Sequence, residues 1–129
     1  MTYRLGTRSK ENLEGVHFDL VKVVRRAIEL TEQDFTVIDG LRTEREQRKL
    51  VARGVSKTMN SRHLTGHAVD IVPYPIPRDW NEYQAVQWRM IEDAMKQAAK
   101  ELKVSIEWGG DWKNGWDKPH YQLPRGEYK

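Results

Sequence analysis

The stretch Ser61-Arg-His-Leu-Thr-Gly-His-Ala-Val-Asp-Ile-Val72 places two histidines and an aspartate where an irregular polar segment meets a short strand. Residues 68–72 alternate as a strand should, so Asp70 lies on the opposite face from Val69 and Ile71. A carboxylate between two apolar residues is costly to bury unless something pairs with it. The stretch therefore predicts a strand whose acid has a specific partner.

Helices and strands flank this strand without regular βαβ alternation. Helical spacing of apolar residues predicts a helix over 17–32, and the capping box Thr43-Glu-Arg-Glu46 predicts a second over 44–53, stopped by Gly54. Asp79 can cap a third helix over 80–102. Its expected core residues are Val86, Ile91, Met95, Ala98 and Leu102. The remaining strands are expected at 35–39, 104–108 and 120–122, and the segments 54–65 and 73–77 are expected to be irregular.

These elements predict an α+β fold, with a small and mainly antiparallel sheet flanked by about three helices. The chain has 129 residues, of which 38% are hydrophobic, so residues 1–129 are expected to form a single domain. There is no cysteine, which excludes disulfides and thiolate ligands from this sequence. Any metal must therefore be bound through nitrogen and oxygen.

The charge pattern and the N-terminus bear on location and partners. The net charge is +3 with an isoelectric point near 9.2, and basic residues are interspersed with acidic ones. Since they do not cluster on one helix or strand, a nucleic-acid partner is not expected. No apolar run of signal-peptide or membrane-spanning length occurs, so we expect synthesis in a reducing cytosol and no membrane insertion.

Three residues form the preferred metal-ligand set: His63, Asp70 and His120. Imidazole and carboxylate are natural Zn²⁺ ligands, and three of them leave a fourth position open for the water of a catalytic site. The competing set would use His63 and His67, which a helix would place on one face. Gly66 argues against a helix there, so His67 is expected to support the site or to contact substrate.

The motifs Ser61-x-His63-x-x-Gly66-x-Ala68-x-Asp70 and Asp117-x-x-His120 closely resemble those of zinc D-alanyl-D-alanine carboxypeptidases and dipeptidases, and of phage L-alanyl-D-glutamate endolysins. Gly40-Leu-Arg42-Thr-x-x-x-Gln47 is similar to the family's substrate-binding Arg segment. Aspartate at position 117, where the carboxypeptidases typically have glutamate, favours the endolysin branch, as does Trp108-Gly-Gly-Asp111-Trp112. The resemblance implies the hedgehog/DD-peptidase fold and one Zn²⁺ ion.

The resemblance also implies roles for individual residues. Asp117 would be the general base, and Arg42 would stabilise an oxyanion or anchor a substrate carboxylate. Supporting or substrate-binding residues would be Ser61, Gln47, His67, Asp111 and Trp108.

The function expected from this resemblance is cleavage of the L-alanyl-D-glutamate bond in the peptidoglycan stem peptide during host lysis. The alternatives are a D-alanyl-D-alanine carboxypeptidase and a non-catalytic zinc-binding module of the same fold. The enzyme is expected to act as a monomer without a separate cell-wall-binding domain. It would reach the wall after a holin-like protein permeabilises the membrane.

Overall fold

Four strands form one antiparallel sheet in the order β1–β2–β4–β3, as seen in a computed structural model that describes residues 2–56 and 58–129. The strands are β1 (Phe35–Asp39), β2 (Ala68–Pro73), β3 (Glu107–Trp108) and β4 (His120–Gln122). The predicted α+β class and antiparallel sheet are confirmed. The strand expected over 104–108 is shorter than predicted, because only its last two residues pair with β4, although Val104 is still buried.

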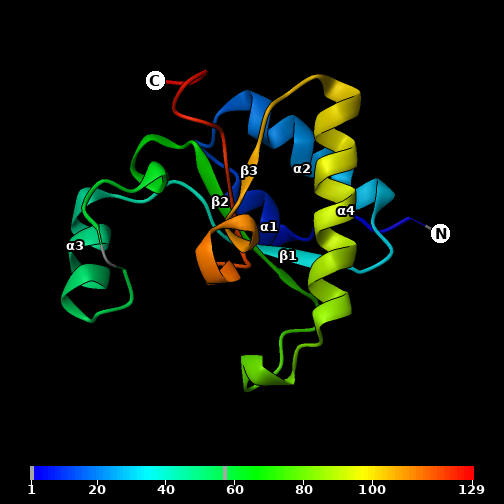
Figure 1. The fold of residues 1–129 in the computed structure, drawn as a ribbon, viewed down its shortest axis with the longest axis horizontal. Coiled ribbons are helices and arrows are strands. Elements are labelled where there is room, and N and C mark those ends of the chain that lie inside the picture. Colours follow the sequence, from blue (N-terminus) through cyan, green and yellow to red (C-terminus); the bar gives the residue numbers. More distant parts are fainter. Residues whose placement is uncertain (1, 57) are drawn as a thin grey trace.

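Two helices supply most of the core on one face of the sheet. These are α2 (Phe18–Leu30) and α4 (Ala85–Leu102), which pack against each other (Figure 1). Alternation in β2 and β4 sends Val69, Ile71 and Tyr121 into this core. The opposite face of the same strands is thereby left for Asp70 and His120, which are directly paired across the two strands.

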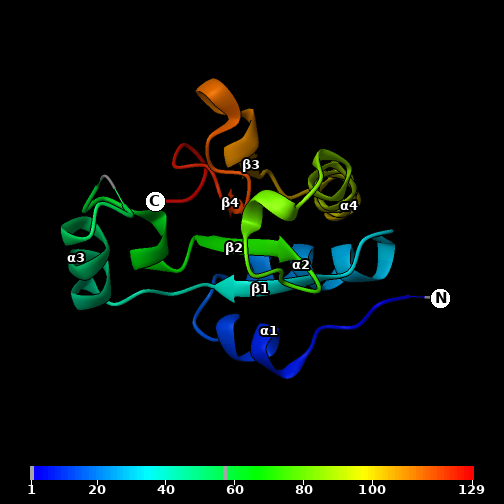
Figure 2. The same cartoon turned by 90° about the horizontal axis from the view of Figure 1, so that it is seen from below.

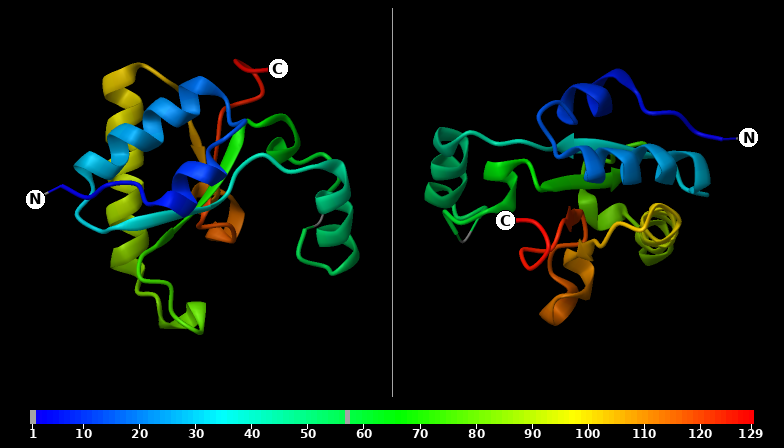
Figure 3. Two further views of the ribbon diagram at one scale, coloured as in Figure 1. Left: turned by 180° about the vertical axis from the view of Figure 1, so that it is seen from behind. Right: turned by 90° about the horizontal axis from the view of Figure 1, so that it is seen from above.

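A short helix, α1 (Thr7–Asn12), covers the outer edge of β1 and was not predicted (Figures 2 and 3). Its sequence has no apolar periodicity, and its role is polar. The Ser9 hydroxyl accepts a hydrogen bond from the Val37 amide at 3.0 Å, and the Asn12 side-chain amide donates to the Val37 carbonyl at 2.8 Å. The helix thus satisfies edge-strand groups that would otherwise need water or another strand.

The helix α3 (Glu44–Ala52) stands away from the core at the end of β1 (Figure 1). Its predicted capping box is present, since Thr43 accepts from the Glu46 amide and Glu46 accepts from the Thr43 amide. Gln47 is the buried residue of this helix. The box stabilises the start of the helix by about 1 kcal/mol. It thereby helps to position Gln47, which contacts Arg42 in the loop before the helix.

The prediction of one helix over 80–102 was wrong at its start. Asp79 caps only the 3₁₀ turn η2 (Trp80–Glu82), after which Tyr83 and Gln84 are extended and α4 begins at Ala85. The Tyr83 hydroxyl donates to the Pro73 carbonyl at 2.6 Å, which ties the break to the end of β2. The shift turns Val86 to solvent, where it is 47% exposed, in place of the predicted core position. Ile91, Met95 and Ala98 are buried as predicted, and Leu102 packs partly buried against the core.

Among the described residues, no helix has both the length and the apolarity to cross a membrane.

Candidate metal centre

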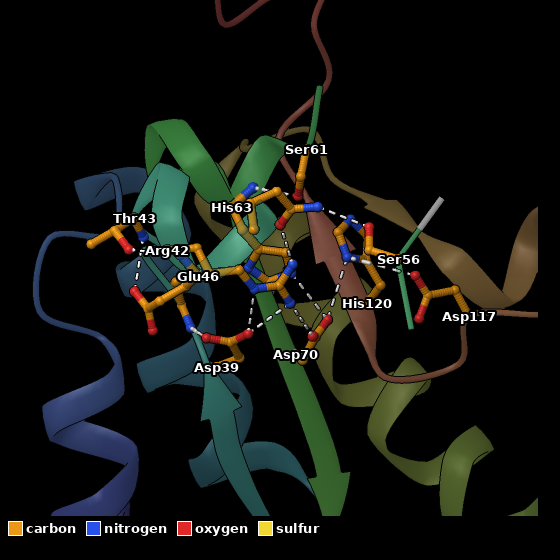
Figure 4. A network of polar contacts seen from close by, with 12 residues as sticks. Asp39, Arg42, Thr43, Glu46, Ser56, Ser61, His63, Asp70, Asp117 and His120 are labelled. Carbon is orange, nitrogen blue, oxygen red and sulfur yellow. Dashed lines mark hydrogen bonds and ion pairs between the residues drawn. The ribbon is translucent and has the colours of Figure 1, made fainter. Parts of the chain in front are cut away.

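The fold brings together three side chains from two separate stretches of the sequence. His63 comes from the 3₁₀ turn η1 (Arg62–Thr65), Asp70 from the middle of β2 and His120 from the start of β4 (Figure 4). One ligand atom from each lies within 4.8 Å of the others. Both imidazoles are buried. Because η1 ends at Gly66 in the left-handed conformation, with φ of 76°, no helix places His63 and His67 on one face.

The hydrogen bonds of His63 determine which ring nitrogen faces the centre. Its Nδ1 lies 2.7 Å from the Gly40 carbonyl, which can only accept, so Nδ1 is the protonated nitrogen. Nε2 then presents its lone pair to Asp70 Oδ1 at 3.3 Å.

His120 is held in the complementary tautomer. Its Nε2 lies 2.7 Å from Gln122 Oε1, an acceptor, because the Gln122 amide nitrogen donates to Glu107 at 2.8 Å. Nε2 is therefore protonated, and Nδ1 faces Asp70 Oδ1 at 3.3 Å. In their neutral forms the two imidazoles would turn lone pairs toward one carboxylate, an arrangement that a bound cation satisfies. Without a cation, protons on these two nitrogens make the hydrogen bonds to Asp70. The donor set fits a divalent metal with nitrogen and oxygen ligands.

Asp70 and His120 shift each other's pKa values, and each favours the charged form of the other. Burial by itself raises the pKa of Asp70, but hydrogen bonds with His120 and His63, together with the charges of these rings, hold it well below its ordinary value. Burial lowers the pKa of His120, yet the hydrogen bond with Asp70 and its negative charge leave that pKa raised overall. The metal and a proton therefore compete for the same nitrogen of His120.

Asp117 lies beside the three-residue group without belonging to it. Its Oδ2 is 3.9 Å from His120 Nδ1, and burial raises the pKa of its carboxyl although the charge of His120 lowers it. A carboxylate with a raised pKa beside residues that could hold a metal ion is suited to accept a proton from water at that site. Gly109 makes this placement possible, since a Cβ there would lie 2.1 Å from the Asp117 carbonyl oxygen.

Arg42 is fixed on the other side of the centre. Its Nε donates to Asp39 at 2.7 Å, its Nη1 donates to Gln47 at 2.8 Å, and its Nη2 lies 3.4 Å from Asp70 Oδ2. A shift in register between Val37 and Asp39 sets Asp39 opposite Asp70. Gln47 in turn donates to Ser56 at 2.8 Å and to the Thr58 carbonyl at 2.6 Å, which anchors the loop after α3.

A groove of about 730 Å³ opens over this centre. Its lining includes the three members of the group, Arg42, Asp117 and Ser61, whose hydroxyl accepts from the His63 amide at 3.2 Å. Three tryptophans and two further arginines also line it: Trp80, Trp112, Trp116, Arg8 and Arg125.

Three residues from the predicted supporting set lie elsewhere. His67 meets the Thr65 hydroxyl at 2.6 Å and packs against His17 and Tyr128. Asp111 pairs with Lys96 at 2.8 Å on the surface. Trp108 stacks on Tyr121 and donates to the Lys118 carbonyl at 2.7 Å, so it supports the loop that carries Asp117.

Sequence reasoning missed four residues that support the centre. Gln122 and Glu107 set the tautomer of His120, Asp39 orients Arg42, and buried Arg62 donates to the Leu123 and Tyr128 carbonyls. Arg62 thereby ties the segment of His63 to the chain that follows His120. The alternation of strand 120–122 places Gln122 on the same face as His120, and this was the only signal available in the sequence.

A groove beside an antiparallel sheet, lined by two imidazoles, a carboxylate and a second acid, has the arrangement of a metal-dependent hydrolase. Comparison with known proteins agrees with this class. Residues 1–125 match the family described as phage L-alanyl-D-glutamate peptidase. The chain is 37% identical to the L-alanyl-D-glutamate peptidase of Escherichia phage T5, over 99% of this chain and 94% of that protein.

Two further relatives support the assignment. The L-alanyl-D-glutamate peptidase of Listeria phage A118 is 30% identical over 95% of this chain, which spans 43% of that longer protein. The crystal structure of Serratia marcescens L-Ala D-Glu endopeptidase ChiX superposes with a TM-score of 0.85 at 43% identity, covering 98% of this chain and 94% of that one. The chain therefore belongs to the phage L-alanyl-D-glutamate peptidase family, and the peptidase class predicted from the motifs is confirmed.

Proposed function

We propose that this chain is a Zn²⁺-dependent endopeptidase that hydrolyses the L-alanyl-D-glutamate bond of the peptidoglycan stem peptide. The observation that supports it most is the pair of tautomers that aim His63 Nε2 and His120 Nδ1 at Asp70, with Asp117 alongside. Zn²⁺ is the metal that best suits two imidazoles and one carboxylate with an open fourth position.

His63, Asp70 and His120 would hold the ion, and Gly40, Gln122 and Arg42 would keep these ligands oriented. When bound, the ion lowers the pKa of a coordinated water and polarises the scissile carbonyl. Asp117 accepts the proton of the attacking water and passes it to the departing D-glutamate amine. Arg42, held in place by Asp39 and Gln47, supplies a preorganised donor for the developing oxyanion or for a substrate carboxylate.

Digestion of purified peptidoglycan, with and without a chelator, tests this function. We expect products whose new N-terminus is glutamate, formed only when Zn²⁺ is present and identified by mass spectrometry. Loss of single alanines alone would indicate a D-alanyl-D-alanine carboxypeptidase. Stoichiometric Zn²⁺ binding without any released product would indicate a non-catalytic zinc-binding module.

Gln122 provides a prediction about metal affinity. Gln122→Met keeps the side-chain length but removes the acceptor for His120 Nε2, so the ring can adopt the tautomer that does not bind metal. We expect Zn²⁺ affinity to fall about 10- to 100-fold, the usual effect of losing such a partner. Competition with a chromophoric chelator measures it. Gln97→Met, at an exposed position on α4, is the control, and equal affinities in the two variants would contradict the role of Gln122.

The pH dependence of Zn²⁺ binding follows from His120. Metal binding requires its neutral form, and the pKa of His120 is raised in the metal-free protein. Protons therefore compete increasingly as the pH falls, and we expect Zn²⁺ affinity to decrease steadily from pH 8 to pH 5.5. Isothermal titration across this range measures the change, with circular dichroism to verify folding. A constant affinity would argue against imidazole ligands.

We further infer that the chain acts as one catalytic domain over 1–129 and as a monomer. It would be made in the host cytoplasm and would meet the peptidoglycan after a holin-like protein opens the membrane. We therefore expect this chain to lyse intact cells only after the membrane has been permeabilised. A lysis assay with and without a permeabilising agent tests this order of events.

A further inference from the structure

The groove over the metal centre continues into a second hollow lined mainly by aromatic rings. This hollow of about 580 Å³ is bounded by Trp80, Tyr83, Trp88 and Trp116. Trp80, Trp116, Asp117 and Pro119 line both hollows. The aromatic hollow is therefore the direct extension of the centre on the side of Asp117.

The rings are displayed on a firm support. Tyr83 is anchored through its hydroxyl to Pro73, and Trp88 packs edge-on against it with ring centroids 5.2 Å apart. Trp80 lies 6.2 Å from Tyr83 on the capped turn η2, which projects from the start of α4 (Figure 1). Trp80 is nevertheless 46% exposed and Trp116 61% exposed. The unpredicted break between η2 and α4 places Trp80 and Tyr83 ahead of α4, where they bound this hollow.

The chemistry of the hollow matches a pyranose. One face of a sugar ring presents C–H groups that stack on the electron-rich face of an indole, while its edge presents hydroxyl and amide groups. Asn81 and Lys118 lie among the aromatic residues and can bond to that edge. In contrast, Arg8, Arg42 and Arg125 line the larger hollow, which suits the carboxylates on the glutamate side of the peptide.

The proposed substrate carries a sugar within reach of this hollow. In peptidoglycan the L-alanine of the stem peptide is joined through a lactyl group to an N-acetylated amino sugar of the glycan strand. When the alanine carbonyl lies at the metal centre, the sugar is about two residue lengths away, or roughly 7 Å. The hollow that begins at Asp117 is within that reach.

We propose that Trp80, Tyr83, Trp88 and Trp116 form a binding site for the N-acetylated amino sugar that carries the stem peptide. This site determines the direction in which the substrate lies, with the glycan over the aromatic rings and the glutamate toward the arginines. The inference rests on the proposed endopeptidase function and adds the sugar as a recognised part of the substrate.

Two soluble substrates test it: a disaccharide–tripeptide that begins its peptide with L-alanyl-D-glutamate, and the same tripeptide without sugars. We expect the intact enzyme to have the higher kcat/KM on the disaccharide form. In Trp80→Ala the ratio of the two kcat/KM values should fall roughly 3- to 10-fold, the range for loss of one stacked ring, and further in Trp80→Ala/Trp116→Ala. Phe18→Ala removes a ring that is 67% exposed on α2 outside both hollows, and should leave the ratio unchanged.

A ratio in the double variant equal to that of the intact enzyme would overturn the sugar site while leaving the endopeptidase function in place. If the intact enzyme cleaves neither substrate, the proposed function fails, and the site is then decided by binding alone. For that, the peptide-free disaccharide is titrated into the protein and the indole N–H resonances are followed by NMR. Shifts confined to the tryptophans of the hollow support the site, and unchanged resonances overturn it.

Discussion

Asp117→Ala is expected to lower kcat on purified peptidoglycan by roughly 10²- to 10⁴-fold while the protein still binds one Zn²⁺. The carboxylate lies beside the ligand group but outside it, with its Oδ2 3.9 Å from His120 Nδ1. Its removal therefore takes away the acceptor for the proton of the attacking water and leaves the three ligands in position. Metal content by atomic emission, measured on the same samples as the rate, separates the two effects.

The matched control is Asp93→Ala, which removes an exposed aspartate from α4. It should retain both the rate and the metal. A variant at position 117 that hydrolyses as fast as the unaltered enzyme would exclude Asp117 as the base. Loss of Zn²⁺ from Asp117→Ala would instead assign this residue to the metal-ligand set.

Asp70→Asn is expected to abolish both metal binding and hydrolysis. The amide has nearly the same shape, but it removes the negative charge that both His63 Nε2 and His120 Nδ1 face. Because a ligand is lost rather than a supporting contact, Zn²⁺ affinity should fall by more than the roughly 10- to 100-fold expected of a supporting partner. Competition with a chelator gives the affinity, and the rate on peptidoglycan gives the functional consequence.

The two aspartate variants together distinguish ligand from base. Asp70→Asn should lack metal and activity at equal protein concentration, whereas Asp117→Ala should lack activity alone. Thermal unfolding of metal-free samples verifies that each variant is folded. Wild-type Zn²⁺ affinity in Asp70→Asn would exclude Asp70 from the coordination sphere.

Local patterns predicted much of the fold. The capping box at Thr43 and Glu46, the alternating strand 68–72 and the apolar spacing of 91–98 each depend on neighbours in sequence, and each is present. Prediction failed where a distant contact decided the conformation. Tyr83 lies outside the helix and donates its hydroxyl to the carbonyl of Pro73, and α1 makes hydrogen bonds to the edge of β1.

The site likewise combines features that the sequence predicted with features set by distant contacts. The residue types and spacings of His63, Asp70, Asp117 and His120 were sufficient to propose the chemistry, since few side chains bind Zn²⁺ or move protons. The sequence did not predict which nitrogen of each histidine faces Asp70, because Gly40 and Gln122 set the tautomers through hydrogen bonds. For Gly40 that bond spans 23 residues.

By itself the sequence determined the strand that carries Asp70, the family and the set of groups that can bind a metal, because these follow from side-chain chemistry and local periodicity. Only the tertiary structure decided that His67, Asp111 and Trp108 lie away from the centre and that Gln122 supports it. The same is true of the aromatic rings that extend the groove beyond Asp117. Those positions depend on how β2 and β4 pair and on where α4 begins, and contacts between distant segments set both.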